Sequence, residues 1–214
     1  MPQILSVNTI MFTILGYPMS YIEFVGTIFY LWSVWLVTRR NILNWPVGMV
    51  SVLLYMVLFY QIQLYSDTIE QVYFLGASVY GWAVWGRAGT GKVVSVGFGS
   101  RRSMLWWAAG TLGLSFLLGG LMTRIHLLLP GIFPVAAAYP LLDALTTVMS
   151  FSAMWLMAQK KTESWIYWIL LDAIGIWLYF VKDVRFLSLL YVILLGMAIN
   201  GLRQWLQGDA DGVA

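Results

Sequence analysis

Three side chains within residues 164–181 have the chemistry to bind a flat, positively charged molecule. Trp165, Trp168 and Asp172 are spaced i, i+3 and i+7, so a helix over this segment places all three on one face. Indole rings stack on aromatic ligands and attract cations, and the carboxylate can balance a positive charge. A carboxylate near the bilayer centre costs about 2.5–3.5 kcal/mol, so Asp172 is expected to face the protein interior and to mark a functional site.

Each of these residues also has a structural interpretation. Tryptophans at positions 35, 45, 85, 155, 165 and 205 fall near one end of the expected membrane spans, where an aromatic belt belongs. Trp165 fits a belt residue and a ligand-binding residue equally well, whereas Trp168, one turn deeper, favours the ligand. Asp172 fits a binding site better than a structural pairing with a neighbouring helix.

Polar residues on two other expected helices could complete the site. Gln71 can both donate to and accept from a carboxamide or a ribose hydroxyl, and Tyr191 occupies the matching position in a later helix. Asn200 is a further candidate, although it also suits interhelical hydrogen bonding and lies on the helix face opposite Tyr191. Asp67 and Glu70 suit helix capping and interfacial solvation better than ligand binding.

Other motifs receive structural interpretations or are rejected. Glu23 and Asp143 open two expected helices at matching positions, which suits a structural role better than a coupling-ion site. Residues 86–92 have the spacing of a phosphate-binding loop, but Val93 stands where a Ser or Thr must hold magnesium. With no cysteine and one histidine, His126, we expect neither a metal site nor a cofactor.

The composition indicates a membrane protein. Of 214 residues, 61% are hydrophobic and 10% are charged, whereas a soluble domain has about 25% charged residues. Because a membrane-spanning helix needs about 20 apolar residues, the apolar runs predict seven spans. They cover residues 21–38, 45–61, 67–86, 104–123, 141–158, 164–181 and 186–205. This length leaves no room for a soluble domain, and the net charge of +3 suits cytoplasmic loops rather than nucleic-acid binding.

The loop charges orient the predicted bundle. Nine of the 12 Lys and Arg residues lie on one side of it, at positions 39, 40, 87, 92, 101, 102, 160, 161 and 203. The positive-inside rule places this side in the cytoplasm, with the N-terminus outside and the C-terminus inside. Residues 1–19 lack the features of a signal peptide, and Gly16 and Pro18 close the segment, so a short interfacial helix is expected there.

An internal repeat at an offset of 120 residues organises the spans. The offset matches the tryptophans 35/155, 45/165 and 85/205 and the glycines 76/196 and 81/201. It predicts an interfacial segment (1–19), a three-helix repeat (20–86), a basic loop with a linker helix (87–136), a second three-helix repeat (137–206) and a tail (207–214). Because the linker helix reverses the chain once more, the two repeats run parallel. An all-α, seven-helix fold arranged as three, one and three helices is typical of transporters.

Several stretches together resemble the PnuC family of bacterial vitamin transporters. They are residues 59–65 (FYQIQLY), Gln71 with residues 80–85 (YGWAVW), residues 163–168 (ESWIYW), 189–191 (LLY) and 200–205 (NGLRQW). Trp165, Trp168 and Asp172 also fill the family signature W-x-x-W-x-x-x-N/D, in which aspartate is a variant. The resemblance covers roughly residues 21–206.

The resemblance implies uptake of nicotinamide riboside by facilitated diffusion across the bacterial inner membrane. A cytoplasmic kinase would trap the substrate for NAD biosynthesis. The protein would assemble as a homotrimer, and its fold would be related to that of the SWEET sugar transporters. Thiamine, another cationic aromatic vitamin, is the alternative substrate. A membrane scaffold is the alternative of another class, but it would not need Asp172 beside tryptophans. No enzyme is expected, because the sequence offers no nucleophile or metal constellation.

Overall fold

The computed structural model describes residues 5–87, 95–128 and 139–210. A short hairpin is followed by helices: β1 (Ile10–Ile14), β2 (Tyr17–Ser20), α1 (Tyr21–Thr38), α2 (Asn44–Gln61), α3 (Tyr65–Gly86), α4 (Arg101–Met122), α5 (Ile125–Leu128), α6 (Pro140–Ala158), α7 (Ser164–Val181) and α8 (Arg185–Ala210). Each of the seven expected ranges is helical. Most of the loop at 86–92, residues 129–136 of the linker segment and residues 211–214 of the tail lie outside the described residues.

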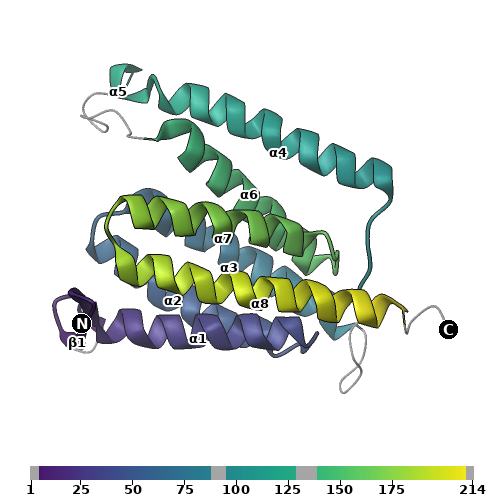
Figure 1. Ribbon diagram of the computed structural model, residues 1–214, viewed down its shortest axis with the longest axis horizontal. Coiled ribbons are helices and arrows are strands. Elements are labelled where there is room, and N and C mark those ends of the chain that lie inside the picture. Colours follow the sequence, from purple (N-terminus) through teal and green to yellow (C-terminus); the bar gives the residue numbers. More distant parts are fainter. Residues whose placement is uncertain (1–4, 88–94, 129–138, 211–214) are drawn as a thin grey trace.

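Six of the helices form a closed ring. Around it, α1 packs on α2, α2 on α3, α3 on α6, α6 on α7, α7 on α8, and α8 returns to α1. Helix α4 lies outside this ring and packs mainly on α6, along one edge of the molecule (Figure 1). The ring is therefore closed where the first three helices meet the last three, at the α3–α6 and α1–α8 contacts.

The described helices include five that are long and apolar enough to cross a membrane, namely α1, α4, α6, α7 and α8. Large apolar side chains on α4 face outward, as expected for contact with lipid; Leu105, Phe116 and Leu117 are 71%, 69% and 74% exposed. Helices α2 and α3 carry more polar residues, among them Asn44, Gln61 and Glu70.

The N-terminal prediction is wrong, because residues 10–20 form an antiparallel hairpin instead of an interfacial helix. The strands are joined by Leu15 and Gly16, both with positive φ (50° and 81°), the backbone of a tight two-residue hairpin turn. The hairpin packs on the start of α1, where Met19 is 1% exposed and the ring of Phe12 meets that of Phe24 edge-on at 5.3 Å. Ser20 then caps α1 by accepting a hydrogen bond from the Glu23 backbone.

The 120-residue offset recurs in the backbone. Helices α2 and α7 begin and end at matching positions, as do the starts of α3 and α8 and the ends of α1 and α6. Residues with left-handed backbone conformation also recur at the 120-residue offset. Arg40 matches Lys160 and Gln63 matches Asp183, all at φ between 56° and 64°. The two halves therefore turn between their helices in the same way.

Candidate functional site

Asp172 lies in the middle of α7 and is 5% exposed. Among the described residues, no side chain or backbone group forms a hydrogen bond or an ion pair with it. It is within electrostatic range of the hydroxyl groups of Tyr30 on α1 and Tyr191 on α8. A buried carboxylate without a partner is costly, and a cation or another strong donor at this position would offset that cost.

Tyr191 lies beside Asp172 because α7 carries a glycine one turn further on. A Cβ at Gly175 would come within 2.5 Å of the Tyr191 ring, so only glycine lets this ring lie directly against the α7 backbone. The other face of Tyr191 stacks on Tyr179, with ring centroids 5.4 Å apart and planes 17° apart. The structure therefore brings together Asp172 and Tyr191, two of the predicted site residues, from two different helices.

Gln71 is buried on α3, with 8% of its surface exposed, and its amide makes no hydrogen bond within the described residues. Its neighbour Glu70 is within electrostatic range of Tyr191, which places this turn of α3 near the same tyrosine. Unpaired amide donors and acceptors at this depth can serve a polar ligand.

Trp168 is half-buried, one turn from Asp172 towards the start of α7, and packs against the main core cluster. Its ring is therefore held from one side while it keeps a partly exposed surface. That arrangement suits a stacking platform beside the carboxylate.

Trp165 lies below this platform in a cluster of four tryptophans from α2, α3, α7 and α8. Trp45, Trp85, Trp165 and Trp205 are each exposed by 2% or less. Ring centroids are 5.3 Å apart for 45/85, 6.0 Å for 85/205 and 5.6 Å for 165/205. A Cβ at Gly81 would come within 2.5 Å of Trp45, and one at Gly201 within 2.6 Å of Trp165, so the matched glycines admit the matched rings.

This burial corrects the aromatic-belt interpretation, which is wrong for the four tryptophans of the cluster. A belt residue faces the lipid interface, as Trp35 does with 43% of its surface exposed and Arg39 4.1 Å above its ring. Trp155 instead stacks on Tyr80 at 4.8 Å. Trp165 is a core residue that supports Trp168.

Two indole hydrogen bonds link the two halves of the ring at this cluster. Trp85 Nε1 on α3 donates to the carbonyl of Ala158 at the end of α6, at 3.2 Å. Trp205 Nε1 on α8 donates to the carbonyl of Val37 at the end of α1, at 3.0 Å. The two bonds are related by the repeat to within one residue. The indole N–H groups of Trp45 and Trp165 have no partner among the described residues.

Asn200 is not brought to the site. It is exposed on α8, and its side chain makes no hydrogen bond with the described residues. The structure thus brings Asp172 and Tyr191 close together, with Trp168 one turn away on α7 against the core cluster that contains Trp165, while Gln71 is buried on α3.

The comparisons with known proteins identify the family of this chain. A family model described as nicotinamide mononucleotide transporter matches residues 20–207. The chain belongs to this family. It is 30% identical to the nicotinamide riboside transporter PnuC of Escherichia coli, with 92% of this chain and 89% of that protein aligned. It is 31% identical to the riboflavin/roseoflavin transporter RibM of Streptomyces davaonensis, over 86% of this chain and 83% of that protein.

The fold is shared with the crystal structure of the vitamin B3 transporter PnuC, at a TM-score of 0.69 and 24% identity, covering 89% of this chain and 83% of that one. The PnuC resemblance is therefore confirmed. Family membership and the apolar helices make the chain a multi-pass protein of a bacterial membrane.

The sequence prediction missed two tyrosines of the helix ring that lie within electrostatic range of Tyr191. Tyr30 on α1 lies near Asp172 and Tyr191, and Tyr55 on α2 shares a 2.8 Å hydrogen bond with Thr27. Both sit inside apolar helices, where a phenol hydroxyl needs a polar partner. This signal was present in the sequence, but it does not identify the partner.

At the opposite end of α1, the hairpin contacts the polar residue Glu23. The Tyr17 hydroxyl donates to Glu23 Oε1 at 2.6 Å, and its ring stacks on Phe186 of α8 at 5.4 Å. Burial and this carboxylate raise the pKa of Tyr17 above its ordinary range, so the phenol stays protonated and remains a donor. These contacts agree with the structural interpretation of Glu23.

Proposed function

We propose that this chain carries nicotinamide riboside across the bacterial inner membrane by facilitated diffusion. The observation that carries the proposal is Asp172, a buried carboxylate without a partner beside the partly exposed Trp168. A pyridinium ring supplies both the flat aromatic surface and the positive charge that these two residues accommodate. Relatives named as nicotinamide riboside transporters support this substrate. Phosphorylation in the cytoplasm would trap it for NAD biosynthesis.

In the proposed binding mode, Trp168 stacks on the pyridinium ring, and Trp165 holds Trp168 in place from the core. Asp172 balances the charge. Gln71 and Tyr191 hydrogen-bond the carboxamide and the ribose hydroxyls from α3 and α8. Asn200 is left out because it is exposed elsewhere on α8.

Riboflavin is the second candidate substrate, because the chain is as similar to RibM as to PnuC in identity. Its ring system is flat and aromatic but uncharged at neutral pH, so it would leave Asp172 without a counter-charge. Thiamine is cationic and would satisfy both Asp172 and Trp168. The charge argument therefore ranks the two cations above riboflavin.

We further propose that the ring is built from two parallel three-helix repeats, α1–α3 and α6–α8, joined by the linker helix α4. The matched helix bounds and the paired α3–α6 and α1–α8 contacts support this 3+1+3 arrangement. Transporters with such repeats rock one half against the other around a central site. The segment boundaries at 19/20, 86/87, 136/137 and 206/207 follow from the same repeat.

The tryptophan cluster is proposed as the closed end of the pathway. The bonds from Trp85 and Trp205 each cross from one half to the other, so rocking must break both. The unpaired indoles of Trp45 and Trp165 partly offset these bonds, because a buried donor without a partner costs about 1–3 kcal/mol. Because the cost of the two unpaired indoles offsets part of the two hydrogen bonds, the closed state can open readily.

The remaining features follow from charge and family. The basic loops place the cluster end in the cytoplasm, with the N-terminus outside and the C-terminus inside. A homotrimer with one pathway per protomer is proposed from the family resemblance. We propose transport without catalysis, rather than a scaffold or an enzyme, because the curated relatives are named as transporters.

The substrate is tested by calorimetric binding to the purified chain in nanodiscs. Nicotinamide riboside is expected to bind more tightly than thiamine and much more tightly than riboflavin. Tightest binding of thiamine would change the substrate but keep the charge argument. Tightest binding of riboflavin would contradict both.

A further inference from the structure

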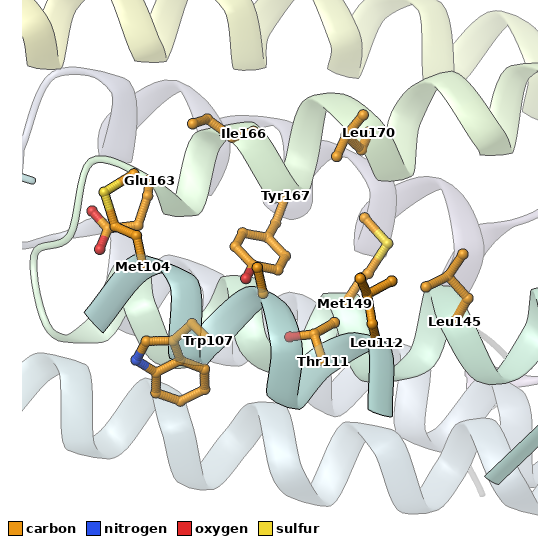
Figure 2. Close-up of a pocket in the computed structure, with 11 residues that line it drawn as sticks. Met104, Trp107, Thr111, Leu112, Leu145, Met149, Glu163, Ile166, Tyr167 and Leu170 are labelled. Carbon is orange, nitrogen blue, oxygen red and sulfur yellow. The ribbon is translucent and has the colours of Figure 1, made fainter. Parts of the chain in front are cut away.

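A cavity of about 280 Å³ lies between α4 and α7, with α6 as its floor, outside the helix ring. Its walls are almost entirely apolar, and Figure 2 shows Met104 and Leu112 from α4, Ile166 and Leu170 from α7, and Leu145 from α6. Ala108 of α4 also lines it. From residue 104 to 112, α4 rises about 12 Å, close to half of the roughly 30 Å hydrocarbon core of a bilayer. The groove therefore has the depth of one lipid leaflet.

A buried carboxylate lies at one end of this apolar groove. Glu163, directly before α7, is 3% exposed, and both of its oxygens accept from the backbone N–H of Gly99 (3.2 and 3.1 Å). Among the described residues, no Lys or Arg lies within ion-pair distance of Glu163. The ion pair that these residues form joins Asp183 and Arg185 at the start of α8. An ionised carboxylate can accept about four hydrogen bonds, so Glu163 keeps unused capacity at this end of the groove, where its oxygens are turned away from the apolar side chains (Figure 2).

A positive charge lies near this end of the groove, at the first residue of α4. Arg101 is exposed and two residues from Gly99, so the two Cα atoms are within about 8 Å. Arg101, Met104 and Ala108 are spaced i, i+3 and i+7, which puts the arginine on the groove-facing side of α4. Arg102 is also exposed but is turned by about 100° around the helix, away from this side.

We propose that the groove binds a phospholipid with a primary ammonium headgroup, of the phosphatidylethanolamine class. One acyl chain fills the apolar groove, the ammonium donates to Glu163, and the phosphate accepts from Arg101. Phosphatidylglycerol has the phosphate but no cation for Glu163, and phosphatidylcholine has a cation without N–H donors. The lipid comes from the leaflet on the side where α4 begins. This site is separate from the helix ring and does not depend on the proposed substrate.

The test is native mass spectrometry of the full chain, equilibrated with phosphatidylethanolamine, phosphatidylglycerol or phosphatidylcholine of identical acyl chains. The wild type is expected to retain phosphatidylethanolamine about tenfold better, the size of one charge-assisted hydrogen bond. Glu163→Gln should abolish this preference. Arg101→Gln should weaken retention of all three lipids, because each carries the phosphate, whereas the control Arg102→Gln should not.

A second pair of variants keeps the test decisive if Glu163→Gln disturbs the loop at Gly99. Ala108→Phe fills the groove, whereas Ala109→Phe adds the same ring one position further on, outside it. Loss of bound lipid in the first variant alone supports the groove. Equal retention of the three lipids by the wild type, or equal retention of phosphatidylethanolamine by both phenylalanine variants, overturns the proposal.

Discussion

Replacing Asp172 with asparagine should change the free protein and the complex in opposite directions. The substitution keeps the size of the side chain and removes its negative charge. In the free protein that charge is buried without a partner, so its removal should be stabilising. In the complex the same charge balances a cation, so its removal should weaken binding. A purely structural aspartate would not give this combination.

The magnitudes follow from the burial of Asp172. A carboxylate at the bilayer centre costs about 2.5–3.5 kcal/mol on insertion scales, and the amide recovers part of this, about 1–2 kcal/mol. For a chain of this size that raises Tm by about 2–8 °C. A hydrogen bond to a charged group contributes about 1.5–3 kcal/mol, so Kd for the cation should rise about 10- to 100-fold.

The assay measures Tm and Kd in nanodiscs with nicotinamide riboside and with its reduced form, which has the same ribose and carboxamide but no charge. The wild type should favour the charged form, and Asp172→Asn should lose most of that preference and keep only the part that Trp168 contributes. Asp183→Asn is the matched control, because Asp183 is 80% exposed in a surface ion pair. A variant that keeps the wild-type preference, or that has a lower Tm without ligand, would refute the reasoning.

Three further predictions concern the supporting residues. Trp168→Ala should weaken nicotinamide riboside binding by about 2 kcal/mol through loss of stacking and cation–π attraction, with Trp168→Phe in between; unchanged calorimetric Kd values would exclude the stacking role. Trp85→Phe with Trp205→Phe removes two bonds of about 1 kcal/mol each, so amide hydrogen exchange should accelerate at the ends of α1 and α6, more than in either single variant. Gly175→Ala should displace the Tyr191 ring and reduce binding, whereas Gly196→Ala, with nothing within 4 Å, should not; equal affinities would contradict the seating of Tyr191.

The helices could be predicted from the sequence because lipid exposure leaves a simple signal. Long apolar runs end at polar or turn residues. The 120-residue offset found in the sequence recurs in the turns of the structure, as at Arg40 and Lys160. The hairpin at residues 10–20 was missed because its apolar residues were interpreted as a membrane-surface helix. The left-handed turn at Leu15 and Gly16 shows how that segment reverses.

Side-chain roles were harder to predict because position along a helix does not determine the direction a side chain faces. Trp35 and Trp165 both lie near helix ends, yet one faces outward and the other is 1% exposed. The matched glycines were visible as a repeat, but their contact with the tryptophan rings depends on how α3 and α8 pack. The burial of Asp172 was predictable, because a charged residue in an apolar membrane helix is expected to face the protein interior.

Counterflow of labelled nicotinamide riboside into proteoliposomes tests the central claim most directly. Liposomes loaded with unlabelled substrate should accumulate the label without ATP or an ion gradient. Thiamine should compete more strongly than riboflavin, and Asp172→Asn should transport with a higher KM while Asp183→Asn matches the wild type. Absence of flux, or flux equally inhibited by riboflavin and unaffected by Asp172→Asn, would contradict a cation-binding transporter.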